Sequence, residues 1–259
     1  MTPRCRLNDN LRVTPPQDLP EASPLHLRRR PPTVRELDAI PWLAELTPPE
    51  RAGVLPEITA VNARPGDHVC RIGRPVTYWF GVIEGLLKMS SETALGQTMT
   101  FAGLPSGGWF GEGTALKREP YRYNVQALRA SVVAGIPVDS FHWLLDHSIG
   151  FNRFVMNQLN ERLGQFIAAR EIDRLADPDV RVARNLAALF NPVLYPGVGQ
   201  VLRITQQELA YLVGLSRQRV NEALATLQKD GLIRTEYGGL RVLDLERLRT
   251  EVPGSAAVT

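Results

Sequence analysis

The segment from residue 205 to residue 229 combines helix-starting residues with a run of long polar side chains. Thr205-Gln206-Gln207-Glu208 fits a capping box, in which the threonine hydroxyl and the glutamate carboxylate satisfy opposite free amides at a helix start. Gly214 can adopt the left-handed backbone that ends such a helix, and Ser216 can cap the next one. The sequence therefore predicts two short helices joined by a tight turn.

The second of these helices is predicted to have one apolar and one polar face. Its apolar residues follow the i, i+3, i+4, i+7 spacing of a buried face: Val220, Ala223, Leu224 and Leu227. The polar face suits base edges and phosphates, because Arg can pair with guanine, Gln or Asn with adenine, and Glu with cytosine. The candidate DNA contacts are Thr205, Gln206, Ser216, Arg217, Gln218, Arg219, Asn221 and Glu222.

A glycine-tipped hairpin is predicted directly after the helix pair. The runs 231–234 and 240–243 flank Tyr237-Gly238-Gly239, which is typical of two strands and a turn. Two helices followed by a hairpin in this order indicate a winged helix-turn-helix. A helical hairpin of purely structural use is the alternative.

No other chemistry is supported by the sequence. We see no paired carboxylates, nucleophile elbow, phosphate loop or zinc spacing, so we expect neither an enzyme nor a metal site or cofactor. Cys5 and Cys70 are too few for the four thiolates that usually hold an iron–sulfur cluster. Haem could use His68, His142 or His147, but lone histidines are more often surface or structural residues.

Composition bounds the class of protein. The 259 residues are 44% hydrophobic and 22% charged, which is typical of a soluble globular protein of two modest domains. No stretch approaches the roughly 20 apolar residues of a membrane span, and no secretory signal opens the chain. We therefore expect a cytoplasmic protein with no membrane partner. The net charge of +3 is too small to indicate a nucleic-acid partner by itself.

The chain divides into five expected segments. Residues 1–33, rich in proline and arginine, are predicted to be a disordered leader. In residues 34–147, short β-branched and aromatic runs alternate with glycine turns from about 57 to 137, which predicts an all-β sandwich or roll. A helical segment covers 148–176, a DNA-binding domain opens at Asp177-Pro178 and covers 177–250, and 251–259 is expected to be a flexible tail.

The helical segment is long for a small domain and carries one apolar stripe, made of Phe151, Val155, Leu159, Leu163, Phe166 and Ile167. Its length indicates a partner helix in a homodimer. The alternative is packing on the chain's own β roll. The candidate dimer interface is Phe151, Val155, Leu159, Leu163 and Phe166.

With these motifs the chain resembles the cyclic-AMP receptor protein / fumarate-nitrate regulator (CRP/FNR) family over nearly all of residues 34–250. "ITQQELAYLVGLSRQRVNEALATLQKDGLI" looks like the family's helix-turn-helix, and "GGWFGEG" looks like the start of its phosphate-binding segment. The resemblance implies an α+β fold: an N-terminal cyclic-nucleotide-binding-type β roll (jelly roll), a long dimerisation helix and a C-terminal winged helix-turn-helix. It also implies double-stranded promoter DNA, a second copy of the chain and RNA polymerase as partners.

The resemblance is weaker at the effector site. Gly111 and Glu112 match the nucleotide-binding relatives, but their later Arg-Ser or Arg-Thr pair reads Arg122-Tyr123 here. Aligning on Val125-x-Ala127 instead places Tyr121-Arg122 at that pair. A tyrosine in place of the small hydroxyl would fill the pocket.

A second departure lies in the long helix, where the cyclic-AMP receptor offers Thr-Ser to the adenine and this chain has Phe166 and Ile167. The candidate effector pocket is Gly111, Glu112, Arg122, Tyr123, Phe166 and Ile167. We expect a regulator that senses an unidentified small molecule, or none. A cyclic-AMP-type regulator is the alternative, and a module whose helix-turn-helix binds proteins is a third.

The resemblance also bears on which bases are read. Arg217 matches a family arginine that reads guanine, whereas Gln218 and Glu222 stand where the cyclic-AMP receptor has a glutamate and an arginine. The half-site is therefore expected to differ from that of the receptor. Arg219 is expected to meet phosphate.

Overall fold

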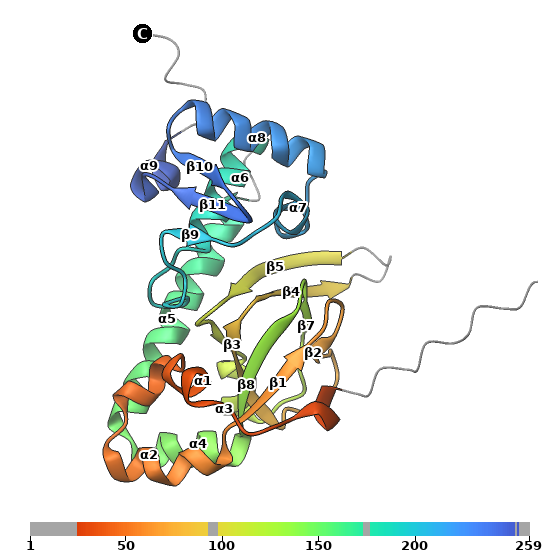
Figure 1. Ribbon diagram of the computed structural model, residues 1–259. Helices are drawn as coiled ribbons and strands as arrows, with labels where there is room; N and C mark the ends of the chain where they lie inside the picture. The colour runs from red at the N-terminus through yellow and green to blue at the C-terminus, as the bar shows by residue number, and fades with distance from the viewer. Residues whose placement is uncertain (1–24, 93–97, 173–176, 252, 254–259) are drawn as a thin grey trace, which may run out of the picture.

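The computed structural model describes residues 25–92, 98–172, 177–251 and 253. Figure 1 shows a β-rich domain, a long helix along its side and a smaller helical domain at the other end of that helix. The α+β architecture and the order of its parts are as predicted from the sequence. Within the described residues, no helix has both the length and the apolar character needed to cross a bilayer.

Two antiparallel sheets face each other and form the β roll. The first contains, in spatial order, β1 (Thr59–Ala63), β8 (Ser131–Pro137), β3 (Tyr78–Glu84) and β6 (Trp109–Phe110). The second contains β2 (His68–Cys70), β7 (Asn124–Ala127), β4 (Leu86–Glu92) and β5 (Thr98–Pro105). Their inner faces meet in one core that includes Val61, Phe80, Val82, Leu87, Leu104, Val125 and Val133. The predicted β roll between about 57 and 137 is confirmed.

Short helices close the roll. They are η1 (Leu25–Arg28), α1 (Val34–Asp38), η2 (Pro41–Glu45), α2 (Pro48–Val54), η3 (Leu55–Glu57), α3 (Glu112–Lys117) and α4 (Val138–His147). Beneath them the rings of Trp42, Trp79 and Trp109 pack together, with centroids 5.3 Å apart for Trp42 and Trp109 and 4.3 Å for Trp79 and Trp109. Trp109 lies so close to β3 that a Cβ at Gly81 would stand 2.3 Å from its ring. Glycine at this position therefore allows the aromatic core to form.

The long helix α5 (Ile149–Ile172) is anchored in that aromatic core. Its buried residues are Phe151, Val155, Gln158 and Arg162, which follow an i, i+4, i+7, i+11 face. The expectation that Phe151 and Val155 supply a dimer interface is therefore wrong, because both side chains are covered within their own chain. For this half of the stripe, the alternative of packing on the β roll is the correct one.

The predicted leader is also too long. Residues 25–33 are ordered against β1, where Arg30 and Ala60 exchange backbone hydrogen bonds of 2.9 and 2.8 Å. Arg30 pairs with Glu36 at 2.5 Å and Arg28 with Asp67 at 2.5 Å. These ion pairs account for ordering in an arginine-rich segment that lacks an apolar pattern. The remainder of the predicted leader, residues 1–24, lies outside the described residues, as does nearly all of the predicted tail.

In the C-terminal part of the chain, Asp177 caps α6 (Pro178–Ala188) through the amide of Asp179. The remaining elements are β9 (Val201–Leu202), α7 (Gln206–Val213), α8 (Arg217–Lys229), β10 (Ile233–Glu236), β11 (Gly239–Val242) and α9 (Leu245–Thr250). The strands form one sheet in the order β10-β11-β9, and the helices share a single apolar core.

Candidate DNA-binding surface and effector cavity

The helix-turn-helix is built by local hydrogen bonds. The Thr205 amide donates to Glu208 Oε2 at 2.7 Å, and the Glu208 amide donates to Thr205 Oγ1 at 3.1 Å, so the predicted capping box is present. Gly214 ends α7 with φ of 71°, a conformation that few residues other than glycine adopt readily. Ser216 then caps α8 through the amide of Arg219 at 3.2 Å.

These caps fix which face of α8 looks outward. The four apolar side chains predicted to be buried are buried. Figure 1 places α8 at the end of the molecule farthest from the β roll. Among the candidate contacts, Arg217, Gln218, Asn221 and Glu222 are exposed together on this helix, and Thr205, Gln206 and Ser216 lie at the two helix starts. Gln206 Nε2 donates to Asn221 Oδ1 at 2.6 Å, which ties the two helix starts together.

Arg219 is placed differently from its neighbours. Its guanidinium lies 2.5 Å from Asp179 of α6 and 3.5 Å from Glu222. The expected phosphate contact of Arg219 would therefore have to compete with an ion pair inside the domain.

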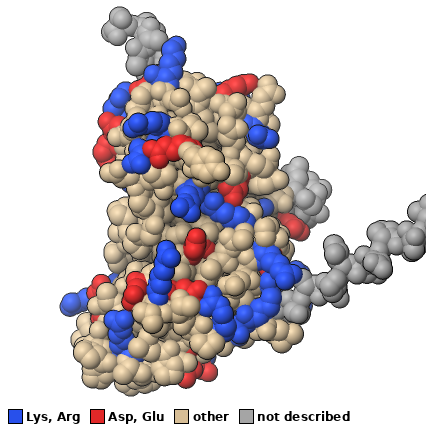
Figure 2. Space-filling model, viewed as in Figure 1, with Lys and Arg blue, Asp and Glu red and all other residues tan. Residues whose placement is uncertain are grey.

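Figure 2 shows basic and acidic side chains interspersed over the C-terminal domain on the viewed face, in keeping with the small net charge.

The predicted wing is present, and it exposes Tyr237, which is not among the candidate DNA contacts. β10 and β11 pair in antiparallel register, with Glu236 opposite Gly239. Tyr237 at the tip is fully exposed. The glycine turn predicts an exposed tip, but nothing in the local pattern indicates that the Tyr237 side chain would be fully exposed to solvent.

A cavity of about 1250 Å³ lies where the β roll, α5 and α7 meet. Of the six candidate pocket residues, Gly111, Glu112, Arg122, Tyr123 and Phe166 line it. Ile167 does not, because the helix turns it by about 100° from Phe166 and leaves it 56% exposed. The far wall comes from the C-terminal domain and includes Tyr211, Leu212 and Gly214.

Polar contacts hold the two domains together beside this cavity. Thr100 Oγ1 donates to the Tyr211 carbonyl at 3.1 Å, and Lys88 lies 5.9 Å from the centre of the Tyr211 ring. Arg129 reaches Glu208 at 3.6 Å and also donates to the Arg203 carbonyl. The cavity is therefore bounded by both the β roll and the helix-turn-helix.

Comparison with known proteins decides the family. Residues 60–148 match the cyclic nucleotide-binding domain, and residues 180–251 match the Crp-like helix-turn-helix domain. The transcriptional regulator SdrP of Thermus thermophilus is 30% identical over 175 residues, which cover 66% of this chain and 81% of SdrP. The chain belongs to the CRP/FNR family of transcription regulators.

Other members of the CRP/FNR family agree with this assignment. The cAMP-activated global transcriptional regulator Vfr of Pseudomonas aeruginosa is 31% identical over 166 residues, covering 61% of this chain and 76% of Vfr. The solved structure of FixK2 from Bradyrhizobium japonicum has the same fold, with a TM-score of 0.60 at 16% identity over 74% of this chain and 95% of FixK2. As a member of this family, the chain is a DNA-binding transcription regulator rather than an enzyme.

Against the CRP/FNR pattern, the phosphate-binding segment is altered as the sequence indicated. The Arg122 side chain is largely exposed and pairs with Glu119 at 2.9 Å. Tyr123 turns inward, and its hydroxyl would lie 3.5 Å from a Cβ at Gly111. Burial raises the pKa of Tyr123 to about 12, so its hydroxyl stays neutral. The pair therefore does not present an arginine and a small hydroxyl to one anion.

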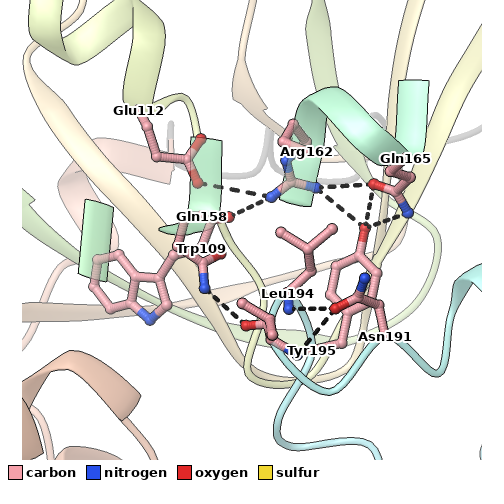
Figure 3. Close-up of polar contacts among 9 residues, drawn as sticks. Trp109, Glu112, Gln158, Arg162, Gln165, Asn191, Leu194 and Tyr195 are labelled. Carbon is pink, nitrogen blue, oxygen red and sulfur yellow. Dashed lines mark hydrogen bonds and ion pairs between the residues drawn. The ribbon is translucent and has the colours of Figure 1, made fainter. Parts of the chain in front are cut away.

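Whereas Arg122 is largely exposed, Arg162 of α5 is buried in the cavity wall beside Glu112. Arg162 is not among the candidate pocket residues predicted from the sequence. Its guanidinium lies 3.7 Å from Glu112 Oε1 and donates to the Trp109 carbonyl at 2.7 Å, as Figure 3 shows. Burial raises the pKa of the Glu112 carboxyl, and the charge of Arg162 opposes that rise only in part. The one available signal was an arginine at the i+11 position of the face that Phe151 begins.

The histidines considered for haem do not converge. His142 and His147 each contact a backbone carbonyl, those of Ala115 and Trp143 respectively. Across the described residues, no three His, Cys, Asp or Glu side chains come close enough together to hold a metal ion.

Proposed function

We propose that this regulator binds DNA as a homodimer and reads a two-fold-related operator with α8. The observation that carries the proposal is the exposed polar face of α8, presented by a capped helix pair and flanked by a wing. A helix of this kind fits the major groove with its N-terminal residues toward the base edges. A protein-binding role for the same helix is less well supported, because its polar side chains suit base edges.

The exposed side of α5 supports the homodimer. Ile149, Met156 and Leu163 recur every seven residues along it, and each is more than half exposed. Ile167 and Phe166 extend the same side toward the C-terminal domain. Leu159 and Phe166 lie three residues after Met156 and Leu163, so both apolar positions of a seven-residue repeat are filled along the 24-residue helix, as in a two-helix seam. The proposed interface is therefore this exposed seam, with Leu159 half-buried beneath it.

The chemistry of the cavity supports an anionic effector with an apolar body. Its lining includes the cations Lys88, Lys117, Arg122, Arg162 and Arg170, against the two acids Glu112 and Glu119. Phe101, Leu159 and Phe166 supply apolar surface between them. Its volume exceeds the roughly 300–1000 Å³ of ordinary small-molecule sites. An anion larger than a small metabolite would fill it.

Cyclic AMP is a poor candidate for this effector, although Gly111 and Glu112 keep the cyclic-nucleotide-responsive alternative open. Titration calorimetry of the wild type with cyclic AMP should give weak or no heat, because Tyr123 occupies the space beside Gly111 and Phe166 offers no hydrogen bond to a base. Tyr123→Ser, which reopens that space, should bind more tightly than the wild type. A micromolar dissociation constant for the wild type would contradict this prediction.

Salt dependence tests the DNA-binding proposal. The affinity for duplex DNA should fall steeply between about 50 and 200 mM salt, since each neutralised phosphate contributes a slope near −0.9 in log K against log salt. Anisotropy of a labelled duplex measures this. Affinity that does not change with salt, or no binding at low salt, would refute the proposal. Contact with RNA polymerase stays a prediction from the family resemblance.

A further inference from the structure

The loop between α6 and β9, residues 191–199, belongs to the C-terminal domain by sequence but packs in the β roll. Leu194 and Tyr195 are fully buried and share the core of Phe110 and Leu104. The backbone of the loop touches the turn before β6, because a Cβ added at Gly107 would lie 2.4 Å from the Gly197 nitrogen. We call residues 191–199 the latch loop.

Arg162 binds the latch loop from α5. Its Nη1 donates to Tyr195 Oη at 3.1 Å, while its Nη2 donates to the Trp109 carbonyl at 2.7 Å and faces Glu112. Gln165, one turn further along α5, also hydrogen-bonds the Tyr195 hydroxyl at 3.2 Å. Figure 3 shows these groups converging from α5, the β6–α3 segment and the latch loop.

Two further contacts fix the shape of the loop. Gln158 Nε2 donates to the Val193 carbonyl at 2.7 Å. Asn191 Nδ2 donates to Glu161 at 3.1 Å, and Asn191 Oδ1 accepts from the amides of Val193 and Leu194 at 2.9 Å each. The loop is therefore bonded to α5 at several points and joins the two domains.

The same arginine forms part of the cavity wall. The Arg162 side chain is only 8% exposed, and a buried charge that loses its partners is strongly destabilising. Its acidic neighbour, Glu112, also lines the cavity and has Oε1 buried without a hydrogen-bond partner. Any change in charge at Glu112 alters the partners of Arg162, and Arg162 holds Tyr195.

We propose that Arg162 is a positioning residue, which couples the effector cavity to the orientation of the DNA-binding domain through Tyr195 and the latch loop. In the structure, where the latch loop is bonded to Arg162, Arg217, Gln218 and Asn221 are exposed on α8. We take this arrangement to be the one presented to DNA. This inference rests on the proposed DNA-binding function. Closing the latch fixes the two recognition helices of a dimer for simultaneous binding, whereas a single domain on a half-site needs no such fixing.

Hydrogen exchange tests the latch without DNA. Tyr195→Phe removes one hydroxyl and keeps the ring, so the amides of Tyr195 and Val198 should exchange about tenfold faster, as expected for a lost bond to a charged group. Tyr121→Phe is the matched control, because Tyr121 is buried in the same core and its hydroxyl donates within the β roll, to the Tyr78 carbonyl at 3.0 Å. Equal exchange of the latch loop in the two variants would overturn the proposal.

Glu112→Gln tests the link from the cavity. Among the described residues Glu112 has its ion pair with Arg162 and no hydrogen bond or ion pair with the latch loop. The substitution should nevertheless speed exchange in the loop, because it removes the counter-charge of Arg162. An unchanged latch loop in Glu112→Gln would overturn the coupling through Arg162.

DNA affinity gives the second readout. Tyr195→Phe should bind a full two-fold operator about tenfold more weakly and a half-site as the wild type does, whereas Tyr121→Phe should match the wild type on both. Faster exchange with unchanged full-site affinity, or an equal loss on the half-site, would overturn the positioning role. If the wild type itself fails to bind DNA, the proposed function fails while the exchange result still stands.

Discussion

Leu163→Glu should convert the proposed dimer into monomers and weaken operator binding by about 100-fold or more. Leu163 is 60% exposed at the middle of the apolar seam of α5. In a symmetric dimer the same patch meets itself, so the substitution would bring two carboxylates into one apolar interface. The loss on DNA follows because a monomer gives up the avidity of a second half-site, which is commonly worth 10²–10⁴ in affinity. Light scattering measures the first effect, and anisotropy on a labelled duplex measures the second.

Asn157→Glu is the control for this substitution. Asn157 is exposed on α5 about 100° around the helix from Met156, so the new charge avoids the seam. This variant should stay dimeric and bind DNA as the wild type does. A dimeric Leu163→Glu would place the interface elsewhere, and a monomeric Asn157→Glu would show that any added charge disrupts the helix.

Arg217→Ala and Gln218→Ala should relax the choice of bases at one position each. Both side chains are exposed at the start of α8, where base edges can be reached. A lost bidentate contact costs about 1–3 kcal/mol of discrimination against the wrong base. Competition between the operator and duplexes with single base changes should therefore show a preference reduced by about 5- to 150-fold at the affected position.

Arg219→Ala is expected to behave differently. As a phosphate contact, Arg219 would contribute to affinity on all sequences alike. Its pairing with Asp179 adds a structural role, since the variant leaves a partly buried carboxylate without its cation. The variant should therefore lose DNA affinity by the same factor on duplexes of every sequence. If base preference is unchanged in both Arg217→Ala and Gln218→Ala, this face of α8 does not recognise the bases.

The helix-turn-helix could be predicted nearly residue by residue because its signals are local. The Thr205–Glu208 capping box, Gly214 and Ser216 each act within one helix turn, and the structure confirms all three. The apolar face of α8 also follows from spacing alone.

α5 was harder to predict because its apolar residues serve two surfaces. Phe151 and Val155 pack in the β roll, whereas Leu163 and Ile167 face outward. The buried face continues through Gln158 and Arg162, which are polar and so do not extend the apolar stripe. Their role depends on Trp109, Glu112 and the latch loop, which are distant in sequence.

Residues 25–33 are a second segment whose structure depends on contacts distant in sequence. An arginine-rich segment without apolar periodicity is typical of disorder, yet Arg28 and Arg30 find acidic partners and a strand edge in the folded domain. Such contacts depend on the tertiary structure, and no local pattern predicts them.

Selection of bound duplexes from a random pool, with the full-length wild type, tests the central claim most directly. A homodimer that reads DNA with two copies of α8 should enrich a two-fold-related motif whose half-sites are centred about one DNA turn, roughly 34 Å, apart. The half-site should differ from that of the cyclic-AMP receptor at the positions facing Gln218 and Glu222. Enrichment of an unsymmetrical motif, or of no motif at all, would contradict the account.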